Sequence, residues 1–307
     1  MSFEESENGF RIAGSVTAKA LVKAQEMVHE GMPLSELCEK VEAELRVQGC
    51  EPAFPLNVSI DSVAAHYTPS SMDMDSVIPK SSVVKIDAGA HYKGYIADSA
   101  VTVSFNPEAD RIVRASREAL LEALSHIRRD IRLGDLGGLI EAKIRSYGVN
   151  PIVDLTGHTI KRYELHAGVS VPNVANGVSF RFTPGVAVAI EPFTTYGVGK
   201  IKEDSVGKIF RGLRRVRTPT RLDERILEYA LGTRKGMPFT DRWLVSFASK
   251  EEVYNSIIRL VRAGGIYEYK VLLEKSGGLV AQFEHTIFMS NDGPVVTTKR
   301  EDESLPI

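Results

Sequence analysis

The sequence is short of cysteine and has no marked excess of either charge. Cys38 and Cys50 are the only cysteines among 307 residues, which excludes a disulfide framework and a zinc site made of thiolates. The 38 lysines and arginines are balanced by 40 aspartates and glutamates, so the net charge of -2 gives no general argument for nucleic-acid binding. These counts indicate a cytosolic protein with two reduced thiols.

Long hydrophobic runs are absent as well. No stretch approaches the roughly 20 uninterrupted apolar residues of a membrane-spanning helix. The first residues, MSFEESENGF, carry acids where a secretory signal needs lysine or arginine. We therefore expect a cytoplasmic protein with no membrane partner. Its 43% hydrophobic and 25% charged residues are typical of a globular chain with a sizeable core.

The predicted elements follow the same order twice. Two helices with apolar stripes precede a set of strands, and the order then repeats. These segments are residues 11–29, 34–49 and 81–105, then 107–127, 133–148 and 185–195. The repetition predicts an α/β (α+β) fold of two similar halves whose strands form a joint sheet.

The segment after residue 196 breaks this order. Thr220 and Asp223 have the spacing of a capping box that opens a helix, and a second helical pattern follows before strands resume. We therefore predict a helical insert at residues 197–265, within a domain made of residues 1–196 and 266–307.

Two aspartates fall inside the longest predicted hairpin, which turns around Lys93 and Gly94. If the chain turns near Tyr92 and Lys93, Asp87 lies directly opposite Asp98 on the ladder. Like charges in that position destabilise a sheet unless a cation lies between them or one carboxyl is protonated. The pair therefore indicates a divalent metal site. The alternative is one buried aspartate and one at the solvated rim.

Other acids and histidines interrupt apolar or glycine-containing segments. Glu191 ends the run VAVAIE, Glu284 lies within AQFEHTIF, and His158 and His166 lie in TGHTI and LHAG. A charged residue in an apolar strand needs a partner or a metal, whereas a single histidine of this kind is as a rule a hydrogen-bonded structural residue. Four carboxylates with one or two histidines match a dinuclear hydrolase site, although spacing alone does not show that they meet.

Six segments in this order resemble the methionine aminopeptidases. They are AAHYTP (64–69), IDAGAHYKGYIADSAVTV (86–103), GHTI (157–160), LHAG (165–168), AIEPF (189–193) and AQFEHTI (281–287). The order of the acids and histidine is shared by the wider creatinase-like, or pita-bread, metallopeptidases. The long segment before the last of these motifs resembles the type II subfamily, and PFTDRW resembles its archaeal members. The resemblance implies a pita-bread fold, with two halves around a mainly antiparallel curved sheet and a winged-helix-like insert.

The resemblance also implies a metal centre and a mechanism. Two divalent ions, for which Co, Mn, Fe and Zn all remain open, would be held by Asp87, Asp98, His158, Glu191 and Glu284. A hydroxide bridging the ions would attack the first peptide bond, with Glu191 transferring the proton and His166 stabilising the oxyanion.

Substrate contacts follow from the same resemblance. His66 matches the family histidine near the scissile bond, which fumagillin-type epoxides alkylate. Phe54, Leu165 and Tyr269 match residues of the methionine pocket, although each would also suit a hydrophobic core. A further family histidine, expected after Glu191, has no counterpart in the segment GKIKEDSVGKIF.

The resulting expectation is a monomeric enzyme that removes the initiator methionine from nascent proteins and prefers a small second residue. Two alternatives remain on the same fold. One is an Xaa-Pro peptidase similar to prolidase, although those enzymes usually carry a further N-terminal domain. The other is a non-catalytic relative that binds nucleic acid or ribosomes, which the intact ligand positions disfavour.

The insert contains a run of arginines in RGLRRVRTPTR. They are Arg211, Arg214, Arg215, Arg217 and Arg221. Such a run is as a rule a solvated basic face, and the functional interpretation is attraction to ribosomal RNA where nascent chains emerge.

Overall fold

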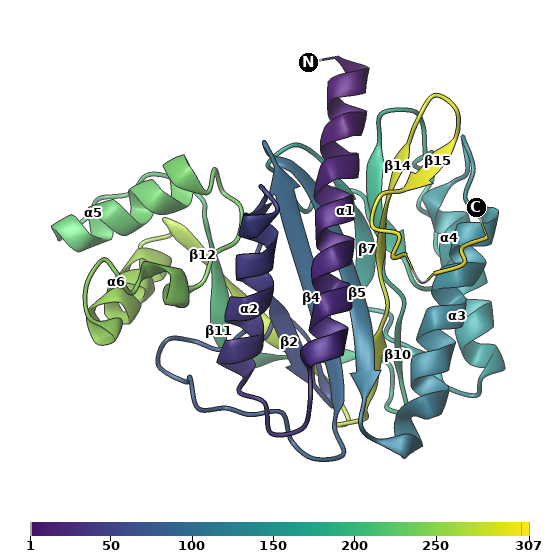
Figure 1. Ribbon diagram of the computed structural model, residues 1–307, viewed down its shortest axis with the longest axis horizontal. Coiled ribbons are helices and arrows are strands. Elements are labelled where there is room, and N and C mark those ends of the chain that lie inside the picture. Colours follow the sequence, from purple (N-terminus) through teal and green to yellow (C-terminus); the bar gives the residue numbers. More distant parts are fainter. Residues whose placement is uncertain (1, 302, 307) are drawn as a thin grey trace.

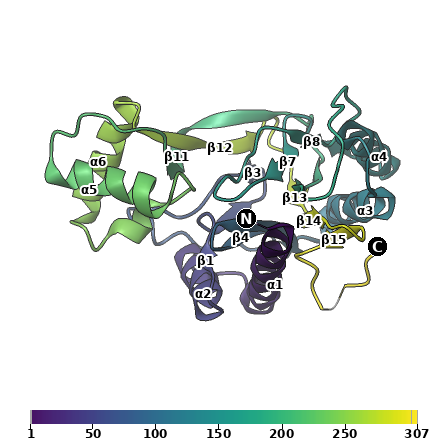
Figure 2. The ribbon, with the colours of Figure 1, turned by 90° about the horizontal axis from the view of Figure 1, so that it is seen from above.

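The computed structural model describes residues 2–301 and 303–306, and it contains two pairs of helices packed on antiparallel strands (Figure 1). The first pair is α1 (Phe3–Met27) and α2 (Leu34–Val47), and the second is α3 (Asp110–His126) and α4 (Leu133–Ser146), which follows a short 3-10 turn η1 (Pro107–Ala109). Figure 2 shows α1 and α2 on one side of the strands and α3 and α4 at one end. The predicted order of helix pairs and strands is confirmed.

The strands form four hydrogen-bonded sheets, and all strand pairs among the described residues are antiparallel. In the first sheet β4 (Val83–Tyr92) pairs with β1 (Glu51–Pro52), β2 (Asn57–Ile60) and β5 (Tyr95–Ser104). The five-stranded sheet runs in the order β15 (Pro294–Val296), β14 (His285–Met289), β9 (Ala187–Ile190), β7 (Thr156–Ile160) and β8 (Ser170–Pro172). The two smaller sheets are β13 (Val280–Gln282), β10 (Phe193–Thr195) and β6 (Asn150–Pro151), and β11 (Ile201–Gly212), β12 (Ile266–Glu274) and β3 (Val63–Ala65).

Side-chain hydroxyls join the two halves along β5. The Thr286 hydroxyl donates to the Asp98 carbonyl at 2.7 Å and accepts from the Asp98 N–H at 2.8 Å. The Ser99 hydroxyl donates to the Glu284 carbonyl at 2.6 Å, and the Glu284 N–H donates to the Ala100 carbonyl at 3.0 Å. These bonds place β5 of the first half beside β13 and β14 of the second.

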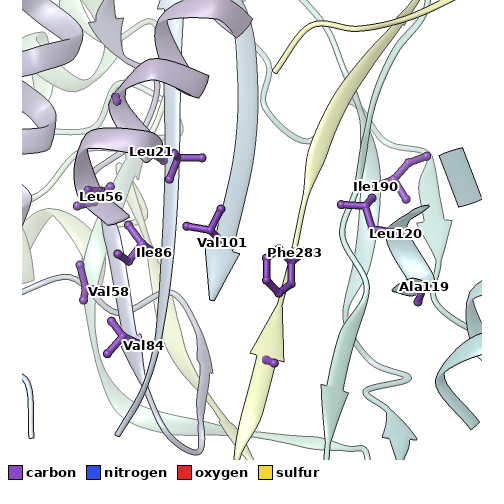
Figure 3. Close-up of a cluster of buried hydrophobic side chains, with 14 of the residues drawn as sticks. Leu21, Leu56, Val58, Val84, Ile86, Val101, Ala119, Leu120, Ile190 and Phe283 are labelled. Atoms are coloured by element: carbon purple, nitrogen blue, oxygen red, sulfur yellow. The ribbon is translucent and has the colours of Figure 1, made fainter. Parts of the chain in front are cut away.

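A shared hydrophobic core fills the space between the strands and the helices. Leu21 and Ile86 of the first half and Leu120 and Ile190 of the second belong to one buried cluster, and Phe283 lies between the two groups (Figure 3). Burying one such side chain contributes about 1.5–3 kcal/mol. The halves are therefore fused through their core as well as through β5.

The register of the β4–β5 hairpin differs from the prediction. Tyr92 pairs with Tyr95, so the two-residue turn is Lys93 and Gly94, which have φ of 51° and 91°. Asp87 consequently pairs with Ala100, and the prediction that Asp87 lies directly opposite Asp98 is wrong by two residues. Because side chains alternate with a period of two, both aspartates still point to the same face, as diagonal neighbours.

Helix α1 begins eight residues before the predicted start. The Ser2 hydroxyl accepts a hydrogen bond from the Glu5 N–H at 3.1 Å and caps the helix. Gly9 and Phe10 are buried within this additional length. None of the described helices combines the length and apolar composition needed to cross a membrane.

The segment expected to be a helical insert begins with strand β11, which runs along β12. Its helical part is α5 (Arg221–Glu228), a π-helical turn η2 (Tyr229–Thr233), a 3-10 turn η3 (Asp241–Leu244) and α6 (Lys250–Arg262), and it projects beyond the sheets at the left of Figure 1. The predicted capping box of Thr220 and Asp223 is confirmed. These helices enclose their own buried cluster, which includes Phe210 and Ile257. The insert boundaries at residues 197 and 265 stay a prediction.

Candidate active site

Five acidic and imidazole side chains meet in a cavity of about 360 Å³ between the two halves. We call them the ligand cluster: Asp87, Asp98, His158, Glu191 and Glu284. The first two come from β4 and β5, His158 comes from β7, Glu191 follows β9, and Glu284 lies between β13 and β14. The structure thus brings together all five residues that the sequence predicted as metal ligands, and that role stays a prediction.

The cluster is tight enough for a metal centre. His158 Nε2 lies 3.5 Å from Asp98 Oδ2 and 3.8 Å from Glu191 Oε1. One ligand atom each from Asp98, His158 and Glu284 lie within 4.8 Å of one another. The predicted repulsion between Asp87 and Asp98 therefore extends to a larger group of buried acids.

Local breaks in the strands aim two of the acids into the cavity. Glu191 is followed by Pro192, whose carbonyl accepts a hydrogen bond from the Ser116 hydroxyl at 2.7 Å. The Asn173 amide donates to the Glu191 carbonyl at 3.0 Å. Glu284 lies in the gap between β13 and β14, and β5 holds its backbone. Proline has no N–H to donate to a ladder, and both glutamates lie where one strand ends and the next begins.

Burial dominates the electrostatics of the cluster. It raises the pKa of Asp87, Glu191 and Glu284 well above the usual range, and neighbouring carboxylates raise each of them further. Burial likewise raises the pKa of Asp98 to about 7 and lowers that of His158 to about 4. The buried atoms Asp87 Oδ1, Asp98 Oδ1 and Glu284 Oε1 have no hydrogen-bond partner in the described structure. Such acids need a cation or bound protons.

Two more predicted histidines lie beside the cluster. The His166 ring lies 4.4 Å from that of His158, between ring centroids, and the Tyr269 ring lies 5.4 Å from His66 and 6.3 Å from His166. Burial lowers the pKa of both His66 and His166, the latter to about 2. Both imidazoles are therefore neutral at physiological pH and can donate one hydrogen bond each.

The predicted pocket residues line the same cavity. Phe54, Leu165 and Tyr269 form part of its apolar wall. Ile209, which belongs to the segment that lacks the expected histidine, also lines it and pairs with Tyr269 across β11 and β12. The same segment also contributes Ile201 and Glu203 to the lining, so it supplies two aliphatic side chains and one acid but no imidazole.

Sequence reasoning missed Gln282. Its side chain is buried, and Nε2 lies 3.4 Å from both Glu191 Oε2 and Glu284 Oε2, to which it donates. The available signal was an amide in the apolar run AQFE two residues before Glu284, because that spacing places both side chains on one face of an extended chain.

The arginine run does not form one exposed face. Arg214, Arg215, Arg217 and Arg221 are exposed. Arg215 pairs with Glu228 at 2.7 Å. Arg211 is half-buried, with its guanidinium 5.6 Å from the ring centroid of Tyr267, which lines the cavity. Arg211 therefore packs against a residue of the cavity wall and is not part of the exposed basic face.

Comparisons with known proteins agree with this geometry. The sequence model of metallopeptidase family M24 matches residues 8–290. A methionine aminopeptidase of Thermococcus onnurineus is 40% identical over 289 residues, which cover 93% of this chain and 97% of the relative. A methionine aminopeptidase structure from Thermotoga maritima superposes with a TM-score of 0.69 at 23% identity, over 98% of both chains. A thermophilic Arx1 structure superposes with a TM-score of 0.81 at 16% identity, over 97% of this chain and 91% of that one. Both structures are similar in fold.

Proposed function

This chain belongs to metallopeptidase family M24, and we propose that it removes the N-terminal methionine from proteins with the ligand cluster as its catalytic centre. The observation that carries the proposal is the set of buried carboxylate oxygens without partners, which lies in the same cavity as the apolar side chains of Phe54, Leu165 and Ile209. The high identity to a methionine aminopeptidase over nearly the full chain supports the same activity.

The chemistry of the donors fits two divalent ions. Four carboxylates and one imidazole supply enough ligands for a pair of ions and leave positions for water and substrate. Both cysteines are buried, and neither lines the cavity. Oxygen and imidazole donors suit Co, Mn, Fe and Zn alike, so the supply of metal in the cell decides which is bound. When bound, the ions lower the pKa of water and polarise the scissile carbonyl.

The residues around the centre have separate tasks. Glu191 is the base, because its carboxylate faces the cavity and its proton can pass on to the leaving amine. His166, next to His158, donates a hydrogen bond to the developing oxyanion. His66, against Tyr269, contacts the substrate near the scissile bond.

The substrate methionine fits the apolar side of the cavity. Phe54, Leu165, Ile209 and Tyr269 surround the space into which a linear thioether side chain extends. One methylene is worth about 1–3 kcal/mol of discrimination in such a pocket, so a close fit separates methionine from shorter residues. The preference for a small second residue follows the family and belongs to this proposal.

The site of action in the cell is part of the same proposal. A monomer that acts on nascent chains in the cytoplasm suits two free, buried cysteines. The exposed arginines Arg214, Arg217 and Arg221 favour docking to ribosomal RNA. Neutralising these arginines should abolish co-sedimentation with ribosomes, and unchanged co-sedimentation would remove the docking part alone.

One assay tests the activity. After exhaustive chelation the protein should be inactive. Added divalent metal should then restore release of methionine from Met-Ala-Ser, and Ala-Pro peptides should stay uncleaved. Preferential cleavage of Ala-Pro would indicate the prolidase alternative, and no cleavage of either peptide would indicate the non-catalytic alternative.

The role of His66 has its own test. His66→Ala should fold, keep its metal and lose most of kcat; an unchanged kcat would refute the role of His66.

A further inference from the structure

The helical part of the insert supplies a segment that reaches the wall of the active site. We call residues 234–243 the insert loop; it runs from the end of η2 into η3. Pro238 lines the cavity, and Met237 belongs to the same buried cluster as Phe54 and Leu165. The insert is therefore part of the pocket and not only an appendage to the sheet.

The first anchor of the insert loop is Arg234. It is 5% exposed, and its Nη2 donates to the carbonyls of Pro52 at 2.9 Å and Ala53 at 2.8 Å. Nε and Nη2 also donate to the Pro238 carbonyl, at 3.2 and 2.8 Å. One guanidinium thus ties the loop to the two residues that directly precede Phe54.

The second anchor is the pair Asp241 and Arg242, which holds the segment after His66. Asp241 Oδ2 accepts hydrogen bonds from the Ser70 hydroxyl at 2.7 Å and from the Ser71 hydroxyl and N–H at 2.6 and 3.0 Å. Arg242 donates to the Pro69 carbonyl at 2.9 Å and to the Thr68 hydroxyl at 3.1 Å. Each of the four residues 68–71 therefore forms a hydrogen bond with Asp241 or Arg242 of the insert.

Helix α2 completes the second anchor. Glu42 accepts from Arg242 Nη2 at 2.9 Å and from Trp243 Nε1 at 2.7 Å. The side chains of Glu42 and Arg242 are 3% and 5% exposed. We call Glu42, Arg234, Asp241 and Arg242, with their partners, the insert-loop network.

The backbone of His66 explains why such anchoring matters. His66 has φ of +64°, a left-handed conformation that residues with a side chain adopt uncommonly and at a cost in free energy. Its ring is held by a hydrogen bond between Nδ1 and the Lys270 carbonyl at 3.2 Å. Holding the next residues fixed restricts the alternative backbone conformations of His66.

We propose that Arg234, Asp241 and Arg242 are positioning residues, through which the insert holds Phe54 and His66 in their active geometry. The inference deepens the proposed function and rests on it. Because a misplacement of about 1 Å far from the chemistry can lower a rate about 100-fold, loosening the segment 68–71 should reduce turnover with the metal ligands intact.

A merely structural network would stabilise the insert without affecting turnover, and the insert contains a matched control. Asp223 is fully buried and accepts from the Arg259 guanidinium at 2.7 Å and from the Ser256 hydroxyl. This pair joins α5 to α6 and contacts neither Phe54 nor the segment 68–71 through the bonds it makes.

The experiment compares metal-loaded Asp241→Asn, Arg242→Gln and Asp223→Asn with the wild type, well below each melting temperature. Asp241→Asn and Arg242→Gln should lower kcat on Met-Ala-Ser about 10- to 100-fold at unchanged metal content, and Arg242→Lys should recover part of the loss. Asp223→Asn should lower the melting temperature and keep kcat within about twofold. Equal kcat in Asp241→Asn and the wild type, or an equal loss in Asp223→Asn, would overturn the inference.

A second measurement is independent of activity and separates this inference from the proposed function. The NMR signal of the His66 ring, assigned by its loss in His66→Ala, should shift in Asp241→Asn and not in Asp223→Asn. If the wild type releases no methionine but the His66 signal still shifts in Asp241→Asn, the positioning role stands and the proposed peptidase activity is refuted. An unmoved signal would refute the positioning. If Asp241→Asn does not fold, Ser71→Ala removes one hydroxyl donor and should give about a 3- to 10-fold loss.

Discussion

Buried charge is treated in opposite ways in the ligand cluster and in the insert-loop network. In the cluster, four acids share one cavity, and oxygens of Asp87, Asp98 and Glu284 have no partner. In the network, Asp241 accepts from several donors, and the carboxylate of Glu42 faces the guanidinium of Arg242. Asp98 and Glu284 are as buried as Glu42 and Asp241, so burial alone does not distinguish a reactive site from a structural one.

The two regions differ in whether their buried charged groups have hydrogen-bond or charged partners. An unsatisfied buried acid raises the free energy of the fold and is retained where a ligand compensates for it. A satisfied buried network fixes the positions of the segments that it joins. The cluster is therefore organised for binding, and the network for geometry.

The largest expected effect comes from Asp98→Asn. Removing this charge weakens the metal centre, so kcat/KM for Met-Ala-Ser should fall at least about 1000-fold. The same change removes one of several repelling carboxylates, so the metal-free variant should melt at a higher temperature than the metal-free wild type. Asp135→Asn, at an exposed acid paired with Arg132, is the control and should change neither value. A less stable metal-free Asp98→Asn would contradict the comparison.

Glu42→Gln in the insert-loop network should lower the stability of the metal-free protein, whereas Asp98→Asn should raise it. Here the lost carboxylate leaves the buried Arg242 guanidinium without its counter-charge, which costs about 3–5 kcal/mol of unfolding free energy. Chemical denaturation of metal-free protein measures this loss. Lys40→Met, at an exposed pair with Glu36 on the same helix, is the control and should cost less than about 1 kcal/mol. A loss in Glu42→Gln as small as in this control would show that the network contributes little.

An intermediate effect is expected for Gln282→Met, at the edge of the ligand cluster. Its amide donates to both Glu191 and Glu284, the proposed metal ligands, and losing such a contact behind a ligand lowers metal affinity about 10- to 100-fold. Metal titration of the stripped protein measures this affinity. Gln48→Met removes an amide that donates to Glu44 at 2.6 Å in α2, and it should leave metal affinity unchanged. Equal affinities in the two variants would assign Gln282 to packing alone.

Candidate members of the ligand cluster could be found from local patterns in the sequence, but only the resemblance to the methionine aminopeptidases implied that all five meet. Glu191 and Glu284 stand out as charges in apolar strands, and Asp87 and Asp98 as a pair in one hairpin. Their register was predicted wrongly because the pairing was counted from a turn at Tyr92 and Lys93, whereas Lys93 and Gly94 form the turn and both adopt positive φ. Lysine gives no signal for that conformation, whereas glycine does.

The insert-loop network could not be predicted in the same way. Glu42 and Arg242 are 200 positions apart, and each is an ordinary charged residue in its own segment. The hydrophobic periodicity of a helix predicts which of its residues are buried. It does not identify the residue that pairs with a buried charge. Similarly, the first eight residues of α1 depend on the Ser2 cap and on tertiary burial of Phe10.

The smallest expected effect concerns His91, which lies close to the insert-loop network. Burial, followed by the charges of Arg234 and Lys235, lowers the pKa of His91 to about 4, so its folded form stays neutral. As the pH falls below about 6.5, the unfolded chain takes up a proton that the folded chain refuses, and stability declines until the pH reaches the folded pKa. Between pH 7 and 5 the wild type should therefore lose about 1–2 kcal/mol more than His91→Gln. Denaturation curves at both pH values measure the difference. Parallel losses in His91→Gln and the wild type would mean that neither burial nor the charges of Arg234 and Lys235 lower the pKa of this histidine.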